Sequence, residues 1–220
     1  MYRAAIANSG QVCIAIKRVY VHEDIYDDFI DAIREEARAA AAKMGDGMAD
    51  GVEYGPINNA AQLARVKELV QDAMDSGATV VAGGPWAKVG PSAKEGGFYY
   101  PPTVVTDVRD DMRVVVEEQF GPVLPVLPYQ TDDEAVKRAN GSQYGLGASV
   151  WSSDENAAAR IAQKLDAGSV WVNCHLSLGS GQMPFGGRKQ SGLGAEHSEA
   201  SDLNAYTEPI VIRRAVATEE

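Results

Sequence analysis

Cysteine is scarce in this 220-residue sequence, which contains only Cys13 and Cys174. Two cysteines supply neither a disulfide framework nor the four ligands of a structural zinc site, so we expect no metal centre. This usage is typical of a protein whose thiols stay reduced, and it favours a cytoplasmic location. Cys174 follows a Trp-Val-Asn segment with a strand pattern, and we expect it to be a buried structural thiol.

Long hydrophobic runs and an excess of positive charge are also missing. No apolar run approaches the length of a membrane span, and no long apolar stretch follows Met1 to Ala4, so we expect neither membrane association nor a signal peptide. Lys and Arg number 20 against 31 Asp and Glu, which gives a formal net charge of −11. Such a surface repels phosphate backbones and argues against a nucleic-acid partner.

What the chain does contain is an alternation of helical and strand-like patterns. Because strands separated by helices need crossover connections, we expect an α/β fold with an open, mostly parallel sheet and flanking helices. Three prolines, at 122, 125 and 128, push one strand towards a sheet edge. The expected strands are 18–21, 79–82, 103–105, 123–129, 148–151, 169–173 and 210–212, and the expected helices are 24–44, 59–76, 132–140 and a helix capped by Ser152 with Glu155 that ends near Gly168.

Ligands of such sheets bind on loops beyond the strand ends, which directs attention to three polar, glycine-containing segments. The first, residues 8–13, delivers Cys13 from a turn. A thiol at the start of a helical turn lies near unpaired backbone N–H groups, which favour a thiolate and can hold a developing oxyanion. The alternative is a small buried core thiol.

The second segment, residues 117–123, places two carboxylates and an aromatic ring before a Gly-Pro turn. A carboxylate can accept hydrogen bonds from two ribose hydroxyls, and a ring can pack against a flat heterocycle. The alternative is a charged loop with a packed phenylalanine. The third segment, residues 183–192, contains a Pro-Phe-Gly-Gly turn that permits close backbone approach. It matches neither the Walker spacing nor the dinucleotide fingerprint, and a purely structural turn is the alternative.

In this order, the three segments resemble the aldehyde dehydrogenase superfamily over nearly the whole chain. The family pattern F-x-N-x-G-Q-x-C is matched from Ile6 to Cys13, with Ile6 in place of the usual aromatic residue. The pattern E-x-F-G-P-V is matched from Glu118 to Val123, and P-F-G-G-x-K-x-S-G from Pro184 to Gly192. Further agreement comes from residues 54–57, 144–146, 168–173 and 206–208.

This resemblance implies oxidation of an aldehyde to a carboxylic acid with NAD or NADP. In this family a cysteine adds to the aldehyde to give a thiohemiacetal, which is oxidised to a thioester and then hydrolysed. By resemblance Cys13 is the nucleophile, Glu118 holds the nicotinamide ribose and Phe120 flanks the cofactor. The residues implied to line the substrate site are Leu176, Leu178 and Phe185, whose apolar character favours aliphatic or aromatic aldehydes.

The resemblance also suggests how the chain is organised. Residues 1–204 correspond to the catalytic domain, and residues 205–220 to an oligomerisation strand and tail, so we expect a homo-oligomer. The family's general-base glutamate, oxyanion asparagine and nucleotide-binding domain precede the cysteine. We therefore expect a truncated form that lacks the N-terminal cofactor-binding domain, binds NAD(P) weakly and is inactive alone.

Two alternatives remain open from the sequence. One is a cysteine esterase that uses Cys13 with a nearby histidine, of which His175 lies in the most family-like loop. The other is a non-catalytic, oligomerising fragment that assembles through a sheet edge and an exposed face.

Overall fold

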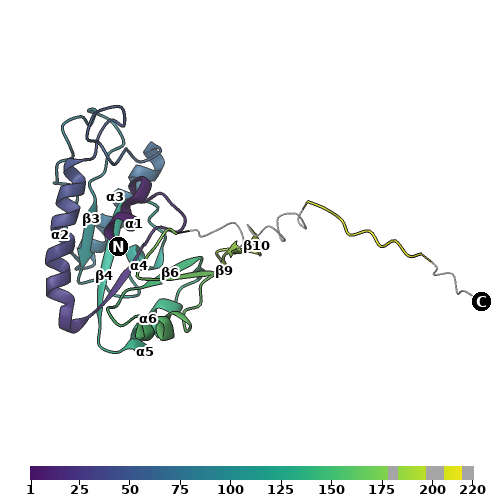
Figure 1. Ribbon diagram of the computed structural model, residues 1–220. Coiled ribbons are helices and arrows are strands. Elements are labelled where there is room, and N and C mark those ends of the chain that lie inside the picture. Colours follow the sequence, from purple (N-terminus) through teal and green to yellow (C-terminus); the bar gives the residue numbers. More distant parts are fainter. Residues whose placement is uncertain (178–182, 197–205, 215–220) are drawn as a thin grey trace, which may run out of the picture.

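The computed structural model describes residues 1–177, 183–196 and 206–214, and its centre is a four-stranded sheet. The strand order is β1-β4-β3-β2, with β1 at Val19–His22, β2 at Thr79–Ala82, β3 at Thr103–Thr106 and β4 at Val123–Tyr129 (Figure 1). Strands β1 and β3 both run parallel to β4, whereas β2 is antiparallel to β3. The expectation of an α/β fold with a mostly parallel sheet is confirmed.

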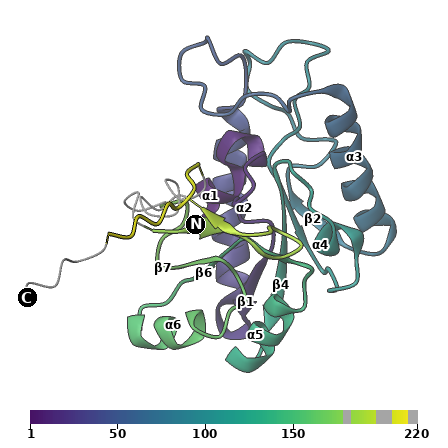
Figure 2. The ribbon, with the colours of Figure 1, turned by 90° about the vertical axis from the view of Figure 1, so that its right-hand side faces the viewer.

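Helices cover both faces of this sheet (Figure 2). Helices α1 (Tyr2–Ile6) and α2 (Tyr26–Ala42) pack on one face, and α3 (Ala60–Asp75) and α4 (Arg113–Val116) pack on the other. Because successive strand residues point to opposite faces, Val104 joins the first core and Val105 the second. A short 3-10 helix, Glu23–Ile25, leads from β1 into α2.

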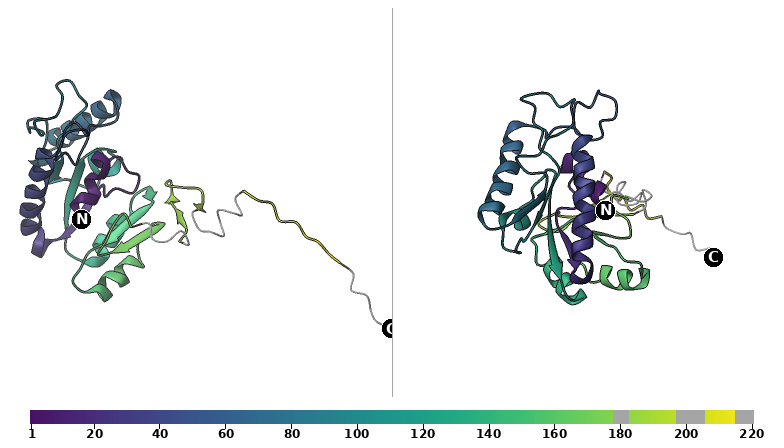
Figure 3. Two further views of the ribbon diagram at one scale, coloured as in Figure 1. Left: turned by 45° about the horizontal axis from the view of Figure 1, so that its top comes forward. Right: turned by 90° about the vertical axis from the view of Figure 1, so that its left-hand side faces the viewer.

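The remaining strands form a smaller, separate part, drawn in green in Figure 3. Strand β6 (Gly147–Val150) pairs in parallel with β7 (Ser169–Val172), and α6 (Glu155–Ala162) connects them and packs on both. Helix α5 (Asp132–Asn140) leads into this part, and its bounds are those predicted from the sequence. Four two-residue strands complete it: β5 (Tyr144–Gly145) pairs with β9 (Arg188–Lys189), and β8 (Phe185–Gly186) pairs with β10 (Ala195–Glu196). None of the helices in the described ranges is long and apolar enough to cross a membrane.

The prediction that β4 lies at an edge is wrong, because β4 is the second strand of the sheet, with a neighbour on each side. Each neighbour pairs with only one part of it: β3 with Val123–Pro125, and β1 with Val126–Tyr129. A proline removes one N–H donor, and a strand that shares its length between two partners can place the missing donor where no ladder bond is needed.

The predicted capping box and length of α6 also need correction. Asp154, not Ser152, caps this helix, since its Oδ1 accepts from the Ala157 N–H at 3.0 Å. The helix ends at Ala162, and the Asn140 side chain binds the backbone of the segment that follows. Its Nδ2 donates to the Lys164 carbonyl, and its Oδ1 accepts from the Asp166 N–H, both at 2.8 Å.

The expected strand at residues 210–212 forms no strand within the single chain. Ile210, Val211 and Ile212 are exposed, and residues 206–214 extend away from the folded body (Figures 1 and 3). Since an oligomerisation strand needs a second copy to pair with, this expectation stays a prediction.

Candidate active site

Cys13 lies in a loop, residues 7–15, which we call the cysteine loop. The loop follows α1 and opens with a 3-10 turn in which Asn8, Ser9 and Gly10 have φ values of 49°, 55° and 73°. It then closes a turn through a hydrogen bond from the Ala15 N–H to the Val12 carbonyl at 2.9 Å, with Cys13 exposed. The nucleophile candidate is therefore presented by a turn within a loop, and not at the start of a helix.

Two backbone donors, the N–H groups of Cys13 and Ile14, flank the Cys13 side chain in this turn. The N–H groups of Cys13 and of Ile14 donate no hydrogen bond within the described part of the chain. Unpaired amides beside a thiol can stabilise negative charge that develops on a bound carbonyl oxygen.

Side chains of the cysteine loop anchor it to a second loop near Gly55. The Ser9 Oγ donates to the Gly55 carbonyl at 2.6 Å. The Gln11 Oε1 accepts from the Asn58 N–H at 2.8 Å, and its Nε2 donates to the Pro56 carbonyl at 3.5 Å. Gln11 and the Tyr-Gly-Pro-Ile segment therefore hold these two loops together.

The cysteine loop also touches a segment about a hundred positions later in the sequence, the acidic loop, residues 117–122. A Cβ placed on Gly10 would overlap the carbonyl oxygen of Gly121, so only glycine permits this approach. The Lys17 Nζ donates to the carbonyls of Gly10, at 2.5 Å, and of Gly121, at 2.9 Å. Burial lowers the pKa of Lys17 to about 8, while the charge of Glu118 acts in the opposite sense.

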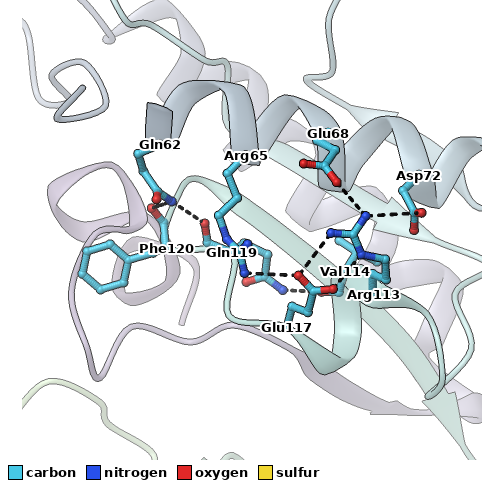
Figure 4. Close-up of polar contacts among 9 residues, drawn as sticks. All are labelled: Gln62, Arg65, Glu68, Asp72, Arg113, Val114, Glu117, Gln119 and Phe120. Atoms are coloured by element: carbon cyan, nitrogen blue, oxygen red, sulfur yellow. Dashed lines mark hydrogen bonds and ion pairs between the residues drawn. The ribbon is translucent and has the colours of Figure 1, made fainter. Parts of the chain in front are cut away.

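The two glutamates of the acidic loop differ in their partners. Glu117 is held by Arg113, with Nε–Oε1 at 2.6 Å, and by Arg65, with Nη2–Oε2 at 3.2 Å (Figure 4). Arg113 also pairs with Glu68 on α3 at 2.7 Å. The hydrogen bond from Arg113 lowers the pKa of Glu117. Glu118 accepts no hydrogen bond and forms no ion pair in the described ranges, so its carboxylate is the one left for a ligand.

Helix α3 also fixes the backbone of the acidic loop. The Gln62 Nε2 donates to the carbonyls of Gln119, at 2.8 Å, and of Phe120, at 3.0 Å. Phe120 has a φ of 43°, in the left-handed region, and its half-buried ring points away from the polar cluster in Figure 4. Its unusual backbone is held by contacts from another element, as expected where strain is retained at a ligand site.

The Pro-Phe-Gly-Gly turn makes a close backbone approach within the chain itself. A Cβ on Gly168 would overlap the Gly186 carbonyl oxygen, so β8 lies directly against the start of β7. Lys189 of the same motif donates from Nζ to the carbonyl of Asn140 at 2.8 Å and pairs with Asp166 at 3.3 Å. In this structure the motif serves packing, which agrees with the structural alternative, and Phe185 at its start is half-buried.

Cys13 and Glu118 share one cavity of about 730 Å³, which Lys17 and His175 also line. Phe120, Leu176 and Phe185 are not among the described residues that line this cavity. Leu176 and Phe185 are half-buried, and Leu176 directly follows His175, which does line it. Leu178 lies outside the described residues. The described ranges hold no group of three or more His, Cys, Asp or Glu side chains that could bind a metal.

Two residues next to each other after β7 behave differently from the predictions. Cys174 is exposed and not a buried structural thiol, because it sits on the loop between Asn173 and Leu176, both of which have positive φ. The His175 Nε2 lies 2.6 Å from the Ile14 carbonyl, and its ring lies 4.6 Å from that of Trp171. Burial lowers the pKa of His175. With Nε2–H donating to this carbonyl, the lone pair of the ring lies on Nδ1, which is buried and has no hydrogen-bond partner within the described residues.

Comparison with known proteins bears directly on this arrangement. The chain is 44% identical over 209 residues to the mitochondrial aldehyde dehydrogenase of Leishmania tarentolae, and 41% identical over 215 residues to the NADP⁺-linked succinate-semialdehyde dehydrogenase of Deinococcus radiodurans. Those matches cover 94% and 98% of the chain but only 40% and 43% of the relatives. The NAD⁺ complex of aldehyde dehydrogenase from Bacillus cereus superposes with a TM-score of 0.85 at 41% identity, over 94% of this chain and 40% of that one.

The chain thus spans about two fifths of the length of these relatives. The sequence profile of the aldehyde dehydrogenase family matches residues 1–212. With nearly the whole chain matched, it belongs to the aldehyde dehydrogenase family.

Proposed function

We propose that this chain carries the nucleophile and part of the cofactor site of an NAD(P)-dependent aldehyde dehydrogenase. The observation that supports this most is the shared cavity, in which an exposed thiol, Cys13, and an unengaged carboxylate, Glu118, are held by loops from distant parts of the sequence. We assign roles to these two residues from the family motifs in which they lie.

Cys13 performs the covalent chemistry in this proposal. Its thiolate adds to the aldehyde carbon, and the carbonyl oxygen takes the negative charge and then a proton, which yields a thiohemiacetal. The N–H groups of Cys13 and Ile14, which have no acceptor in the described ranges, are the donors that we assign to that oxygen. After oxidation the thioester stays on Cys13 until water attacks its carbon, releasing the acid and the free thiol.

Glu118 and Phe120 form the chain's share of the cofactor site. A bound nicotinamide supplies the acceptor for the hydride that leaves the substrate carbon. The free carboxylate of Glu118 fits two ribose hydroxyls, since an ionised carboxylate accepts on both oxygens. Phe120, whose ring is directed away from the polar contacts of its loop, offers an aromatic face to the cofactor. Both NAD and NADP are compatible with these contacts.

For the substrate we propose an aliphatic or aromatic aldehyde. The apolar side chains of Leu176, Leu178 and Phe185 are assigned to its lining by their place in the family motifs. We further propose that residues 1–204 form the catalytic domain and that residues 205–220 mediate a homo-oligomer. A cytoplasmic location is our proposal from the low cysteine content.

The test is protection of Cys13 by an aldehyde. The purified chain is treated with iodoacetamide, with and without an aliphatic aldehyde, and labelling of each cysteine is followed by peptide mass spectrometry. We expect the aldehyde to slow labelling of Cys13 because its sulfur is held reversibly as a thiohemiacetal. Cys174 is a matched internal control, since it is also exposed and should label at an unchanged rate.

A second readout separates this proposal from a simple thiol effect. NAD or NADP is added with the aldehyde, and formation of the reduced cofactor is followed by absorbance, with Cys13→Ala and Cys174→Ala as the paired variants. Any reduction must disappear in Cys13→Ala and persist in Cys174→Ala. Equal protection of both cysteines, or of neither, would overturn the role proposed for Cys13.

A further inference from the structure

The cysteine loop and the acidic loop meet backbone to backbone at Gly10 and Gly121. Their contact brings the two carbonyl oxygens to one place, since a single donor reaches both of them. Carbonyl oxygens that converge carry like partial charges and need a donor between them when water is excluded. The contact between the two loops therefore depends on what fills that position.

Lys17 supplies the donor. Its Nζ lies 2.5 Å from the Gly10 oxygen and 2.9 Å from the Gly121 oxygen. A second hydrogen bond joins Lys17 to the acidic loop, and here the acidic loop supplies the donor. The Gln119 Nε2 donates to the backbone carbonyl of Lys17 at 3.3 Å. Gln119 is fully buried and donates to the Val114 carbonyl as well, so this second tie is fixed on its own side.

A lysine is a costly choice for this position. Its burial favours the neutral amine, and no ion pair of Lys17 exists within the described residues, the nearest favourable charge being that of Glu118. An apolar side chain of similar length would fill the space without that desolvation cost. We attribute the presence of a lysine at this position to the two carbonyls, one from each loop, to which its Nζ donates.

We propose that Lys17 is a positioning residue, which sets the spacing between the cysteine loop and the acidic loop by holding the carbonyls of Gly10 and Gly121 together. The functional meaning of that spacing, which separates the nucleophile Cys13 from the ribose-binding carboxylate of Glu118, rests on the proposed function. The coupling itself is a property of this chain and can be measured without aldehyde or cofactor.

The first test is a pH titration of the loop amides by NMR. It uses Cys13→Ala protein, so that the thiol on the same loop contributes nothing to the shifts. Glu118 faces Lys17 from the acidic loop. The neighbouring titratable groups are His175, which is hydrogen-bonded to the Ile14 carbonyl, and the Met1 amine, which lines the same cavity. We expect amides of both loops to shift with one common pKa of about 8, the value for Lys17.

The matched variant is Lys17→Met in the same Cys13→Ala background, which keeps His175 and Met1 but removes the ammonium. The common titration must vanish from both loops in this variant. Loop shifts that persist near that pH in Lys17→Met, or a titration confined to one loop, would overturn the proposal.

The second test measures hydrogen exchange in chains with an intact Cys13. In Lys17→Met we expect amides of residues 7–15 and 117–122 to exchange about tenfold faster, as loss of a charge-assisted tie permits local opening. Helix α2 should be unchanged. Lys17→Arg should restore much of the protection, since a guanidinium can also donate to two carbonyls. Unchanged exchange in both loops would count against Lys17, and a failure of Lys17→Met to fold leaves the titration of the Cys13→Ala protein to decide.

The two proposals can fail separately. If the aldehyde does not protect Cys13 but both loops respond to Lys17, the dehydrogenase role is wrong and the coupling stands. If Cys13 is protected while the loops ignore Lys17, the function stands and the positioning role is wrong.

Discussion

At the scale of single residues, the site depends on neighbours in sequence that do different work. Glu117 forms ion pairs with Arg113 and Arg65, which fix the acidic loop to α3, while the Glu118 carboxylate has no partner in the described ranges. Gly10 and Lys17 support the same contact in different ways. Glycine lets the two backbones approach, and lysine satisfies the carbonyls that the approach brings together.

The pairing of Glu117 predicts a pH-dependent contribution to stability. Its pKa is lowered in the folded chain, so the stabilisation is present above the ordinary glutamate pKa of about 4.3 and is lost as pH falls through the lower folded value. Because the side chains are partly exposed, Glu117→Gln should cost at most about 1 kcal/mol at neutral pH. Urea denaturation should show this difference shrinking below about pH 4.

Glu118→Gln is the matched control for this prediction, because it removes the adjacent charge without breaking an ion pair in the described ranges. Its effect on the unfolding free energy at neutral pH should be smaller than that of Glu117→Gln, because it removes an attraction for Lys17 but no ion pair. A loss at neutral pH as large as that of Glu117→Gln would show that the two carboxylates do not have separate duties.

Gly10→Ala should destabilise the chain for two reasons. A residue other than glycine at its φ of 73° costs about 1–3 kcal/mol in backbone strain. In addition, the new methyl group would overlap the Gly121 carbonyl and crowd the Lys17 Nζ. Gly51→Ala separates these effects, because Gly51 has a φ of 76° and open space around it. Chemical denaturation should give the larger loss for Gly10→Ala, and equal losses would remove the contact with Gly121 from the account.

At the scale of elements, α3 supports the acidic loop, and its first turn is fixed by Asn59. The Asn59 Oδ1 accepts from the Gln62 N–H at 2.9 Å, and Gln62 in turn holds two carbonyls of the acidic loop. Asn59→Ala should therefore lower the unfolding free energy by about 1 kcal/mol and also speed hydrogen exchange in residues 117–122.

Asp154→Ala serves as the comparison, since Asp154 caps α6 in the same way and, in the described ranges, forms no hydrogen bond or ion pair with the acidic loop. It should cost a similar free energy and leave exchange in residues 117–122 unchanged. If both variants speed that exchange equally, the effect is global loss of stability and not a local role of α3.

Local patterns predicted most of these elements. The apolar spacing predicted α3 within about one residue at each end, and the strand at Thr79–Ala82 was predicted with its observed bounds. The errors arose where distant residues decide. Asn140 binds the segment after α6 about two dozen positions away, and the central place of β4 depends on two strands that share it.

The candidate site shows the same division. The glycines, Cys13 and Glu118 could be selected from motifs, because each is constrained by its own turn. Lys17, Gln62 and Arg113 could not, since their partners lie across the fold and nothing in their local sequence marks them. The exposure of Cys174 was also missed, because a strand pattern does not show where the strand ends.

At the scale of the whole molecule, the described segment 206–214 is the part that single-chain packing does not explain. Ile210, Val211 and Ile212 are 83%, 76% and 84% exposed, an apolar run in an acidic chain. Three adjacent exposed β-branched residues are costly in water and are well suited to join a sheet edge of another copy.

Val211→Pro tests that use, because proline removes a backbone N–H donor that a strand ladder requires. We expect light scattering to show a shift of the purified chain towards the monomer, with an unchanged unfolding curve for the folded body. The measurement is made at physiological salt, since a net charge of −11 keeps copies apart at low ionic strength. Met48→Asp alters another residue that is 93% exposed and should leave the mass unchanged. A monomeric parent chain, or an oligomer that Val211→Pro leaves intact, would rule out this segment as the interface.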